Sequence, residues 1–216
     1  QQPERQGRLR LWRELQRLIG GHPRRPLGLT GRRRNNMEFK AEQFNADHFS
    51  LFDLPPAFRL DAALLDRRYL ELQSQIHPDR FASASEAERR HSLQWATRVN
   101  EAYQTLKKPL SRAKYLLHLA AHDIGSESNT LMPVDFLIEQ MEWREAVAEV
   151  RAAGEHHELE HLHHRLKRDL LERYEEIAML LDDQPDLEQA ADRVRRLMFL
   201  EKLLVEIDEA MAALEE

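Results

Sequence analysis

Glycine is almost absent from most of this 216-residue chain, and that scarcity restricts how the backbone can fold. Five of the seven glycines lie within residues 1–31, and only Gly125 and Gly154 follow. Glycine favours tight turns and is unfavourable inside helices, so a long stretch without it suits helices. Prolines separate segments in which apolar residues recur at helical spacing, and no segment alternates as a strand would. We therefore predict an all-α fold, with helices near residues 60–76, 85–108, 110–121, 133–152, 156–183 and 186–215.

Composition excludes several classes of protein. Hydrophobic residues make up 42% of the chain, which supports a packed core, and charged residues make up 32%, which suits long solvated helices. Cysteine is absent, which excludes a disulfide-stapled domain, thiolate metal ligands and a cysteine nucleophile. No apolar run reaches the length that crosses a membrane.

The segment around Gly125 is the natural linker between two domains, because it is rich in polar and hydroxyl residues. We place an N-terminal helical hairpin domain at residues 46–121 and the linker at 122–132. Residues 133–216 then form a C-terminal antiparallel three-helix bundle.

Residues 1–36 differ from the rest of the chain. They hold ten arginines and two glutamates, a net charge of +8, so the other 180 residues carry −14. Their Pro/Gly/Arg-rich composition predicts a disordered basic extension. An Arg-rich segment is compatible with nucleic-acid binding, with an anionic membrane or with organelle targeting. Because the first residue is Gln, we favour an extension ahead of a true start at Met37, and we assign it no function.

The tripeptide His77-Pro78-Asp79 lies between two helical segments and forms a short charged corner. Proline fixes its own φ and lacks an amide hydrogen, so it ends the preceding helix. The aspartate is then held out in the turn as a hydrogen-bond acceptor. Three residues alone would match by chance in some chains, but Ser85 and Glu88 follow with capping-box spacing for the next helix. No nucleophile lies beside the corner, so it suits protein docking rather than catalysis.

The order of these parts resembles the J-domain, by which DnaJ-type co-chaperones activate DnaK-class heat-shock ATPases. A helix, the His-Pro-Asp loop and a longer helix are followed by Asn-x-Ala-Tyr-x-x-Leu at residues 100–106. Arg67 points outward from the first helix, Arg68 lies on its flank, and Arg80 follows the corner. Together these three arginines form a basic rim next to Asp79, suited to an acidic region of the ATPase, where charge contributes mostly on-rate and orientation.

Three later stretches look like the HscB family, co-chaperones of iron–sulfur cluster assembly. They are residues 109–117, 136–145 and 196–203, and the resemblance covers roughly residue 46 to the C-terminus. The Gly/Phe-rich segment and paired CxxC motifs of DnaJ-type chains are absent. Arg80 departs from the Lys that J-domains usually carry at this position, but the charge is kept. The bacterial form has no counterpart of residues 1–36, and the cysteine-pair motif of the eukaryotic form is missing.

The resemblance implies a function and partners. HscB-like proteins bring an IscU-type scaffold, carrying a nascent cluster, to an HscA-type chaperone and stimulate its ATPase. We therefore expect a monomeric co-chaperone that has no catalytic residues and holds no cofactor or metal. We expect it to bind neither nucleic acid nor membrane. The expected compartment is the cytoplasm of a bacterium, or the mitochondrial matrix of a eukaryote.

Helix geometry supports a second binding surface independently of the family. At 100° per residue from Leu137, Phe136 and Trp143 fall near 240–260°, within a core stripe that Val147 and Val150 extend to about 220–280°. Another apolar stripe falls between about 0° and 100°, and carboxylates lie alongside it at about 80–140°. A helix in a small bundle cannot bury both stripes, so the second predicts an exposed apolar patch.

Phe199 lies off the core stripe of the last helix, and that stripe is formed by Leu197, Leu200, Leu204, Ile207 and Met211. At positions that match the scaffold-binding surface of the family, we predict contacts from Leu137, Ile138, Met141, Glu142, Glu145, Glu149 and Phe199.

Three alternatives compete with this interpretation. His157-Glu158-x-x-His161 matches the zinc-protease signature HExxH, but the histidines lie about 140–200° from the apolar stripe of their helix, and no third ligand is placed. Incidental zinc or nickel binding by the histidines of residues 156–164 fits the pattern better. The second alternative is a general J-domain co-chaperone with another client. The third is a helical adaptor whose arginine arm binds nucleic acid.

Overall fold

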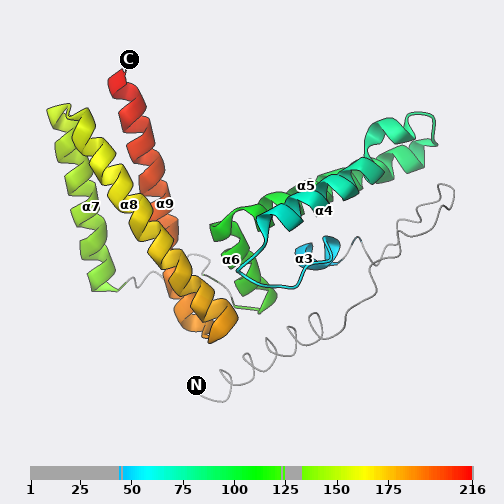
Figure 1. Cartoon of the computed structure of the whole chain (residues 1–216), viewed down its shortest axis with the longest axis horizontal. Helices are drawn as coiled ribbons and strands as arrows, with labels where there is room; N and C mark the ends of the chain where they lie inside the picture. The colour runs from blue at the N-terminus through cyan, green and yellow to red at the C-terminus, as the bar shows by residue number, and fades with distance from the viewer. Residues whose placement is uncertain (1–43, 45, 123, 125–132, 216) are drawn as a thin grey trace. The chain divides into compact units, whose positions relative to one another are not determined.

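A computed structural model describes residues 44, 46–122, 124 and 133–215, and within them the backbone forms helices and no strand (Figure 1). The prediction of an all-α fold is confirmed. The predicted extension at 1–36 and most of the predicted linker lie outside the described residues. The elements are α3 (His48–Leu51), α4 (Ala62–Ile76), the 3-10 helix η1 (Pro78–Phe81), α5 (Glu86–Lys107), α6 (Pro109–Leu119), α7 (Val134–Ala153), α8 (His156–Ala178), the π-helix η2 (Met179–Asp183) and α9 (Leu187–Glu215).

The chain divides into two compact units between Leu116 and Leu117, within α6. We describe each unit by itself. Among the described residues, no helix is both long enough and apolar enough to cross a membrane.

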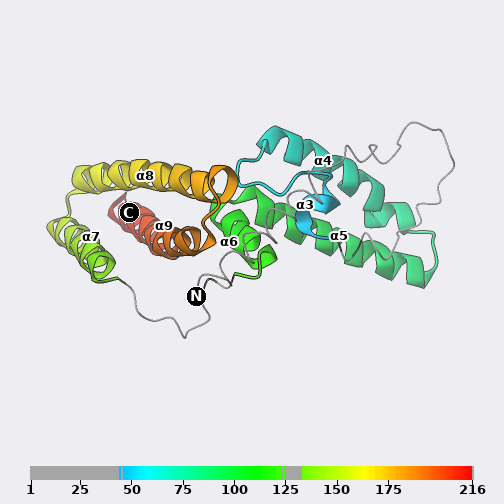
Figure 2. The same ribbon diagram turned by 90° about the horizontal axis from the view of Figure 1, so that it is seen from below.

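The first unit is built on α4 and α5, which lie side by side (Figure 2). Their apolar faces meet in a core that includes Leu65, Ile76, Trp95, Val99 and Leu106, with the phenylalanines of residues 49–58 beside them. The predicted capping box starts α5. The amide of Ser85 donates to Glu88 at 2.9 Å, and the amide of Glu88 donates to the Ser85 hydroxyl at 3.3 Å. The Glu88 carboxylate accepts hydrogen bonds from the hydroxyl and from the amide of Ser85. Both bonds lower the pKa of the Glu88 carboxyl, and the bond from the hydroxyl has the larger effect.

The motif at residues 100–106 holds α5 against α4. The rings of Tyr69 and Tyr103 stack with centroids 4.0 Å apart, and the Tyr69 hydroxyl bonds to the side-chain oxygen of Asn100 at 2.9 Å. The hydroxyl of Tyr103 donates to Asp66 at 2.7 Å, while Ala102 and Leu106 of the motif are buried. The motif therefore serves the packing of the unit that presents the His-Pro-Asp corner.

Helix α3 carries a buried histidine. The His48 ring is 8% exposed and stacks on Tyr115 at 4.2 Å, and its backbone amide donates to the Tyr115 hydroxyl at 2.9 Å. Burial and, to a smaller extent, the nearby Arg98 together lower the pKa of His48 from 6.5 to about 4, although the Asp47 carboxylate partly opposes the shift. The folded chain therefore favours the neutral ring.

Acid should destabilise the first unit through His48. The contribution of the neutral ring to stability is complete above pH 6.5 and is lost as the pH falls toward about 4, because only the unfolded chain takes up the proton there. The shift corresponds to ~3 kcal/mol. Urea unfolding between pH 7.5 and 4.5 measures the loss, which should be smaller in a His48→Phe variant that keeps the stacked ring. An equal loss in that variant would assign the acid sensitivity to other groups.

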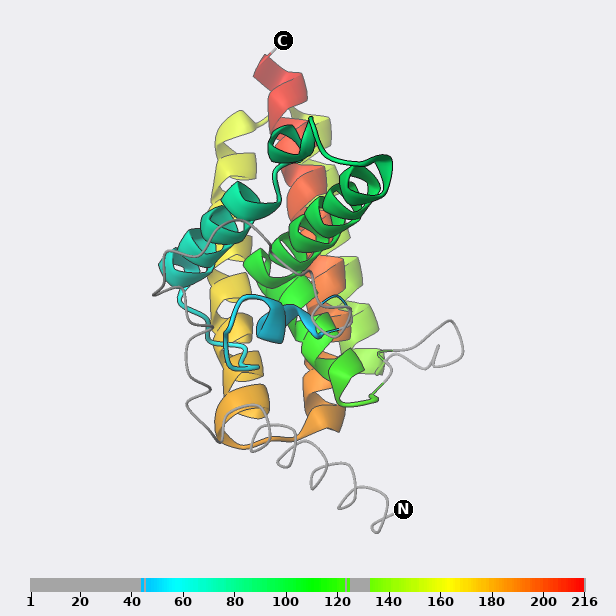
Figure 3. The ribbon, with the colours of Figure 1, turned by 90° about the vertical axis from the view of Figure 1, so that its right-hand side faces the viewer.

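The second unit is a three-helix arrangement in which α8 and α9 run antiparallel along their length (Figure 3). The contact of the His163 Nε2 with the Asp208 carboxylate, at 3.0 Å, sets the register of the two helices at one end, and the bond of Tyr174 to Glu201 sets it nearer the turn. The core stripe predicted for α8 is confirmed by buried Leu159, Leu162, Leu166, Leu170 and Ile177, with Tyr174 half-buried.

Two details of this unit differ from the sequence prediction. The last turn of the predicted helix 156–183 is the π-helix η2, which buries Leu181. In α9 the stripe includes Leu203, which is 1% exposed, whereas the predicted Leu204 is only half-buried. The stripe is displaced toward Leu203 because α9 packs against both α7 and α8, so its buried face is wider than one neighbour would need.

Candidate functional site

The His-Pro-Asp corner is a single 3-10 turn at the end of α4. His77 closes the helix, and its carbonyl accepts from the amide of Arg80 at 3.0 Å. The Nδ1 of His77 accepts from the amide of Asp79 at 3.3 Å and so caps the turn that Pro78 begins. This geometry directs the Asp79 side chain outward, where it is 90% exposed. The predicted projection is therefore present.

Two contacts fix the corner to the rest of the unit. Ser92 of α5 is fully buried, and its hydroxyl donates at 2.7 Å to the carbonyl of Ile76, the last residue of α4. From the other side the Arg80 guanidinium donates to the carbonyl of Ser74 at 2.9 Å. Both bonds satisfy carbonyls that a helix end leaves without an intrahelical partner. The corner is consequently fixed rigidly to helices α4 and α5.

The structure brings together only part of the predicted basic rim. Arg80 lies in the corner itself, whereas Arg67 and Arg68 precede His77 by about 14 Å along α4. Arg67 is exposed, and no carboxylate of the described residues lies within ion-pair distance of it. Arg68 is half-buried and pairs with Asp53 and with Glu71, at 3.5 Å each. Of Arg67 and Arg68, Arg67 is therefore the more available to bind a carboxylate of a partner.

An exposed apolar patch lies on α7, as the second stripe predicts. Val134, Leu137, Ile138 and Met141 are 71%, 44%, 52% and 70% exposed, whereas Phe136 and Trp143 of the same helix are buried. We call these four exposed residues the α7 patch. The carboxylates predicted alongside it, Glu142, Glu145 and Glu149, are exposed too. The predicted exposure is confirmed, while the role of these residues in docking stays a prediction.

Phe199 of α9 lies beside this surface and is held in place. Its half-buried ring meets Phe136 edge-on at 5.8 Å, and the guanidinium of Arg144 lies 5.3 Å from its centroid. Arg196 of α9 also holds this contact between α7 and α9, because its guanidinium lies over the Phe136 ring and donates to Asp135 at 3.1 and 3.2 Å. This bond lowers the pKa of the Asp135 carboxyl. An aromatic held from two sides loses little freedom on binding, which suits an anchor.

Similarity to known proteins decides the family. A relative in Aromatoleum aromaticum, named as a co-chaperone protein HscB homolog, is 56% identical over 169 residues, which is 78% of this chain and 96% of the relative. The chain belongs to the HscB family of co-chaperones. The family model described as the HSCB C-terminal oligomerisation domain matches residues 132–208. Membership confirms the resemblance read from the motifs and makes the chain a co-chaperone of iron–sulfur cluster assembly rather than an enzyme.

Solved HscB structures have the same fold. The chaperone HscB from Vibrio cholerae matches with a TM-score of 0.71 and 36% identity, over 78% of this chain and 99% of that one. The human co-chaperone protein HscB matches with a TM-score of 0.73 and 31% identity, over 82% and 92%. A J-domain followed by a helical C-terminal domain is therefore the arrangement of this HscB chain as well.

The HExxH segment does not form a metal centre within the described residues. His157 and His161 lie on the exposed side of α8, with ring centroids 4.7 Å apart, and His157 contacts Glu160 at 3.3 Å. No group of three or more His, Cys, Asp or Glu side chains in the described part of the chain could hold an ion. His163 instead links α8 to α9 through Asp208.

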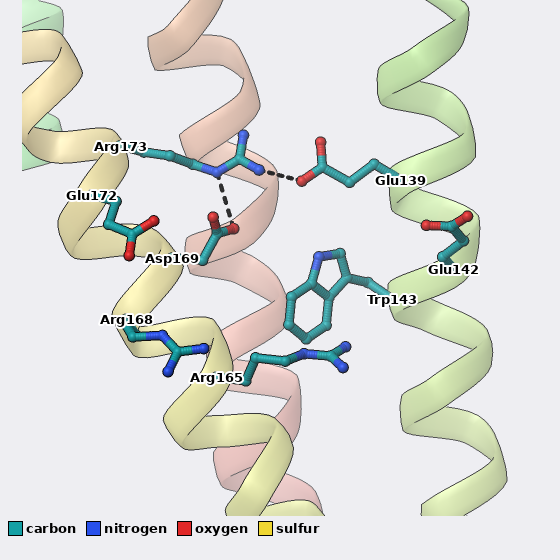
Figure 4. A pocket seen from close by; sticks show the side chains of 8 residues that line it. All are labelled: Glu139, Glu142, Trp143, Arg165, Arg168, Asp169, Glu172 and Arg173. Atoms are coloured by element: carbon teal, nitrogen blue, oxygen red, sulfur yellow. Dashed lines mark hydrogen bonds and ion pairs between the residues drawn. The ribbon is translucent and has the colours of Figure 1, made fainter.

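Sequence reasoning missed an open charged groove of about 640 Å³ between α7 and α8 (Figure 4). Arg173 bridges the helices by bonding Glu139 of α7 and Asp169 of its own helix, the latter at 2.9 Å. Lower in the groove the Arg165 guanidinium lies 4.3 Å from the Trp143 ring. The spacing of Asp169 and Arg173 at i and i+4, beside the apolar stripe of α8, was the available signal. These contacts attach α7 to α8 and thereby position the α7 patch.

Proposed function

We propose that this chain delivers an IscU-type scaffold protein to an HscA-type chaperone and stimulates the ATPase of that chaperone during iron–sulfur cluster assembly. The observation that supports this most is that two exposed surfaces of different chemistry lie in different units. One is a rigid corner with an outward carboxylate, and the other is an apolar patch fringed by glutamates.

The first surface would contact the chaperone. His77, Pro78, Asp79 and Arg80 form the corner, and Arg67 and Arg68 extend a positive face along α4. An acidic region of the ATPase would be attracted by these arginines, which contribute mainly to on-rate and orientation. Because Arg68 is already paired with two carboxylates, we assign it the smaller share.

The second surface would hold the scaffold through Leu137, Ile138, Met141, Glu142, Glu145, Glu149 and Phe199. Exposed apolar side chains around an anchored aromatic make the central part of such an interface, and the glutamates make its polar rim. Methionine adapts its shape to a partner, which suits Met141, the second most exposed member of the patch. Carrying both surfaces on one chain raises the local concentration of the scaffold at the chaperone.

We further propose that the working unit is a monomer in the bacterial cytoplasm. One copy carries both surfaces, so neither activity needs a second copy, although the matched family model names an oligomerisation domain. The similar co-chaperones of Aromatoleum aromaticum and Vibrio cholerae come from bacteria. Its partners are then two proteins, with no part for nucleic acid or membrane.

Steady-state ATP hydrolysis tests the proposal most directly. We expect the chain to stimulate an HscA-type chaperone severalfold, to stimulate it further with an IscU-type scaffold present, and to act little on a DnaK-type chaperone. Equal stimulation of both chaperones, insensitive to the scaffold, would instead identify a general J-domain protein with another client.

A further inference from the structure

A second groove, of about 540 Å³, runs between α7 and α9. Its walls include Leu203, which is 1% exposed, and the half-buried Val147, while Ala148 and Ala152 leave space above them. Small and apolar side chains at the bottom of an open groove admit an apolar side chain from a partner.

The groove is continuous with the scaffold-binding surface proposed above. Arg144 lines the groove and also lies over the ring of Phe199. Ala148 belongs to the same stripe of α7 as Leu137 and Met141, because the three fall within about 40° of one another around the helix. A partner that covers the α7 patch and Phe199 therefore reaches the groove without a break.

The two edges of the stripe carry opposite charges. Glu142, Glu145 and Glu149 lie about 80–140° to one side of Leu137, whereas Arg144 and Arg151 lie about 20° and 40° to the other side. Both arginines are exposed, and no carboxylate of the described residues lies within ion-pair distance of either. Glu206, the acid that lines the groove, contacts Lys202 at 3.9 Å. Two guanidinium groups are thus available to a carboxylate from outside.

We infer that the scaffold-binding surface continues past Phe199 into the groove between α7 and α9, where Arg144 and Arg151 bind a carboxylate beside an apolar side chain of the same scaffold protein. The inference rests on the proposed function, and it specifies the chemistry of the partner. The scaffold surface must present basic groups to one edge of α7 and an acidic group to the other. This polarity fixes the direction in which the scaffold lies along the helix.

Arg151 gives the cleaner test, because Arg144 contacts Phe199 and its replacement would also disturb the anchor. Affinity for a purified IscU-type scaffold without cluster is measured by titration calorimetry with the full chain. Arg151→Glu should weaken binding at least tenfold, Arg151→Gln severalfold, and Arg151→Lys less than twofold. The affinity of Arg151→Glu should also fall less steeply with salt than that of the wild type. Arg168 is also an exposed arginine and lines the groove on the other side of α7, so Arg168→Glu should stay within twofold of the wild type.

Arg151 also lies in the last turn of α7, where a cation stabilises the helix end. Thermal unfolding of each variant separates that effect, since a role confined to the helix lowers the melting temperature and leaves affinity unchanged. Arg151→Glu binding within twofold of wild type, while Ala at Leu137, Met141 and Phe199 abolishes binding, would overturn the extension and keep the proposed function. Normal binding by the Leu137/Met141/Phe199 variant would overturn both.

Discussion

Asparagine at position 79 is expected to abolish stimulation of an HscA-type ATPase, by at least tenfold, and to leave scaffold binding intact. The change keeps the size of the side chain and removes its charge. The Asp79 side chain is 90% exposed, and its carboxylate lies 3.5 Å from the His77 Nδ1, so the fold does not depend on the carboxylate. The loss would then come from the contact with the chaperone. Steady-state hydrolysis over a range of co-chaperone concentrations measures it.

Glu101→Gln is the matched control for this experiment. Glu101 is an exposed carboxylate of α5 in the same unit, and the substitution makes the same chemical change away from the corner. Stimulation by this variant should stay within twofold of the wild type. If Asp79→Asn stimulates as well as the control does, the corner does not dock on the ATPase, whatever the family resemblance implies.

Ala at Leu137, Met141 and Phe199 together should weaken scaffold binding at least tenfold and spare basal ATPase stimulation. Buried apolar anchors at an interface each contribute about 1 kcal/mol or more, and tenfold in affinity corresponds to about 1.4 kcal/mol. Because such contributions are not additive, we state only the lower limit. Titration calorimetry with the scaffold gives the affinity, and hydrolysis without scaffold gives the basal stimulation.

The three positions differ in what they do for the fold. Leu137 and Met141 are largely exposed, so their truncation should cost little stability, whereas Phe199→Ala removes the edge-on contact with Phe136. The Leu137/Met141 double variant therefore checks the binding role without that complication. Leu171→Ala and Val205→Ala, at exposed apolar residues of α8 and α9, should bind the scaffold normally. A loss as large in these controls as in the triple variant would show that general apolar exposure, and not this patch, is responsible.

Helical periodicity explains why so much of this protein was predictable. A helix that carries two apolar stripes can bury only one in a small bundle, and the exposures of Leu137 and Met141 against Phe136 and Trp143 confirm that argument. The corner was predictable for a different reason, since proline at position 78 dictates where α4 must end.

What the sequence did not predict depends on contacts between distant segments. Helix α3 has four residues, too few for a periodic pattern, and it begins where Asp47 caps the amides of Phe49 and Ser50. The burial of Leu203 depends on how α9 packs between two helices. The grooves on either side of α7 arise from pairs of helices, so no single segment contains their pattern.

The Ser92–Ile76 bond has a consequence for the thermodynamics of docking. A loop that samples many conformations must lose that freedom when it binds, which costs affinity. The His-Pro-Asp corner is already ordered in the unbound protein. It is held by hydrogen bonds from the Ser92 hydroxyl, to the His77 ring and from the Arg80 guanidinium. Because this ordering cost is not incurred on binding, a small contact area can be enough for the corner to bind its partner. This ordering also makes Ser92, which is fully buried, a position where a substitution would lower the affinity of the corner for its partner.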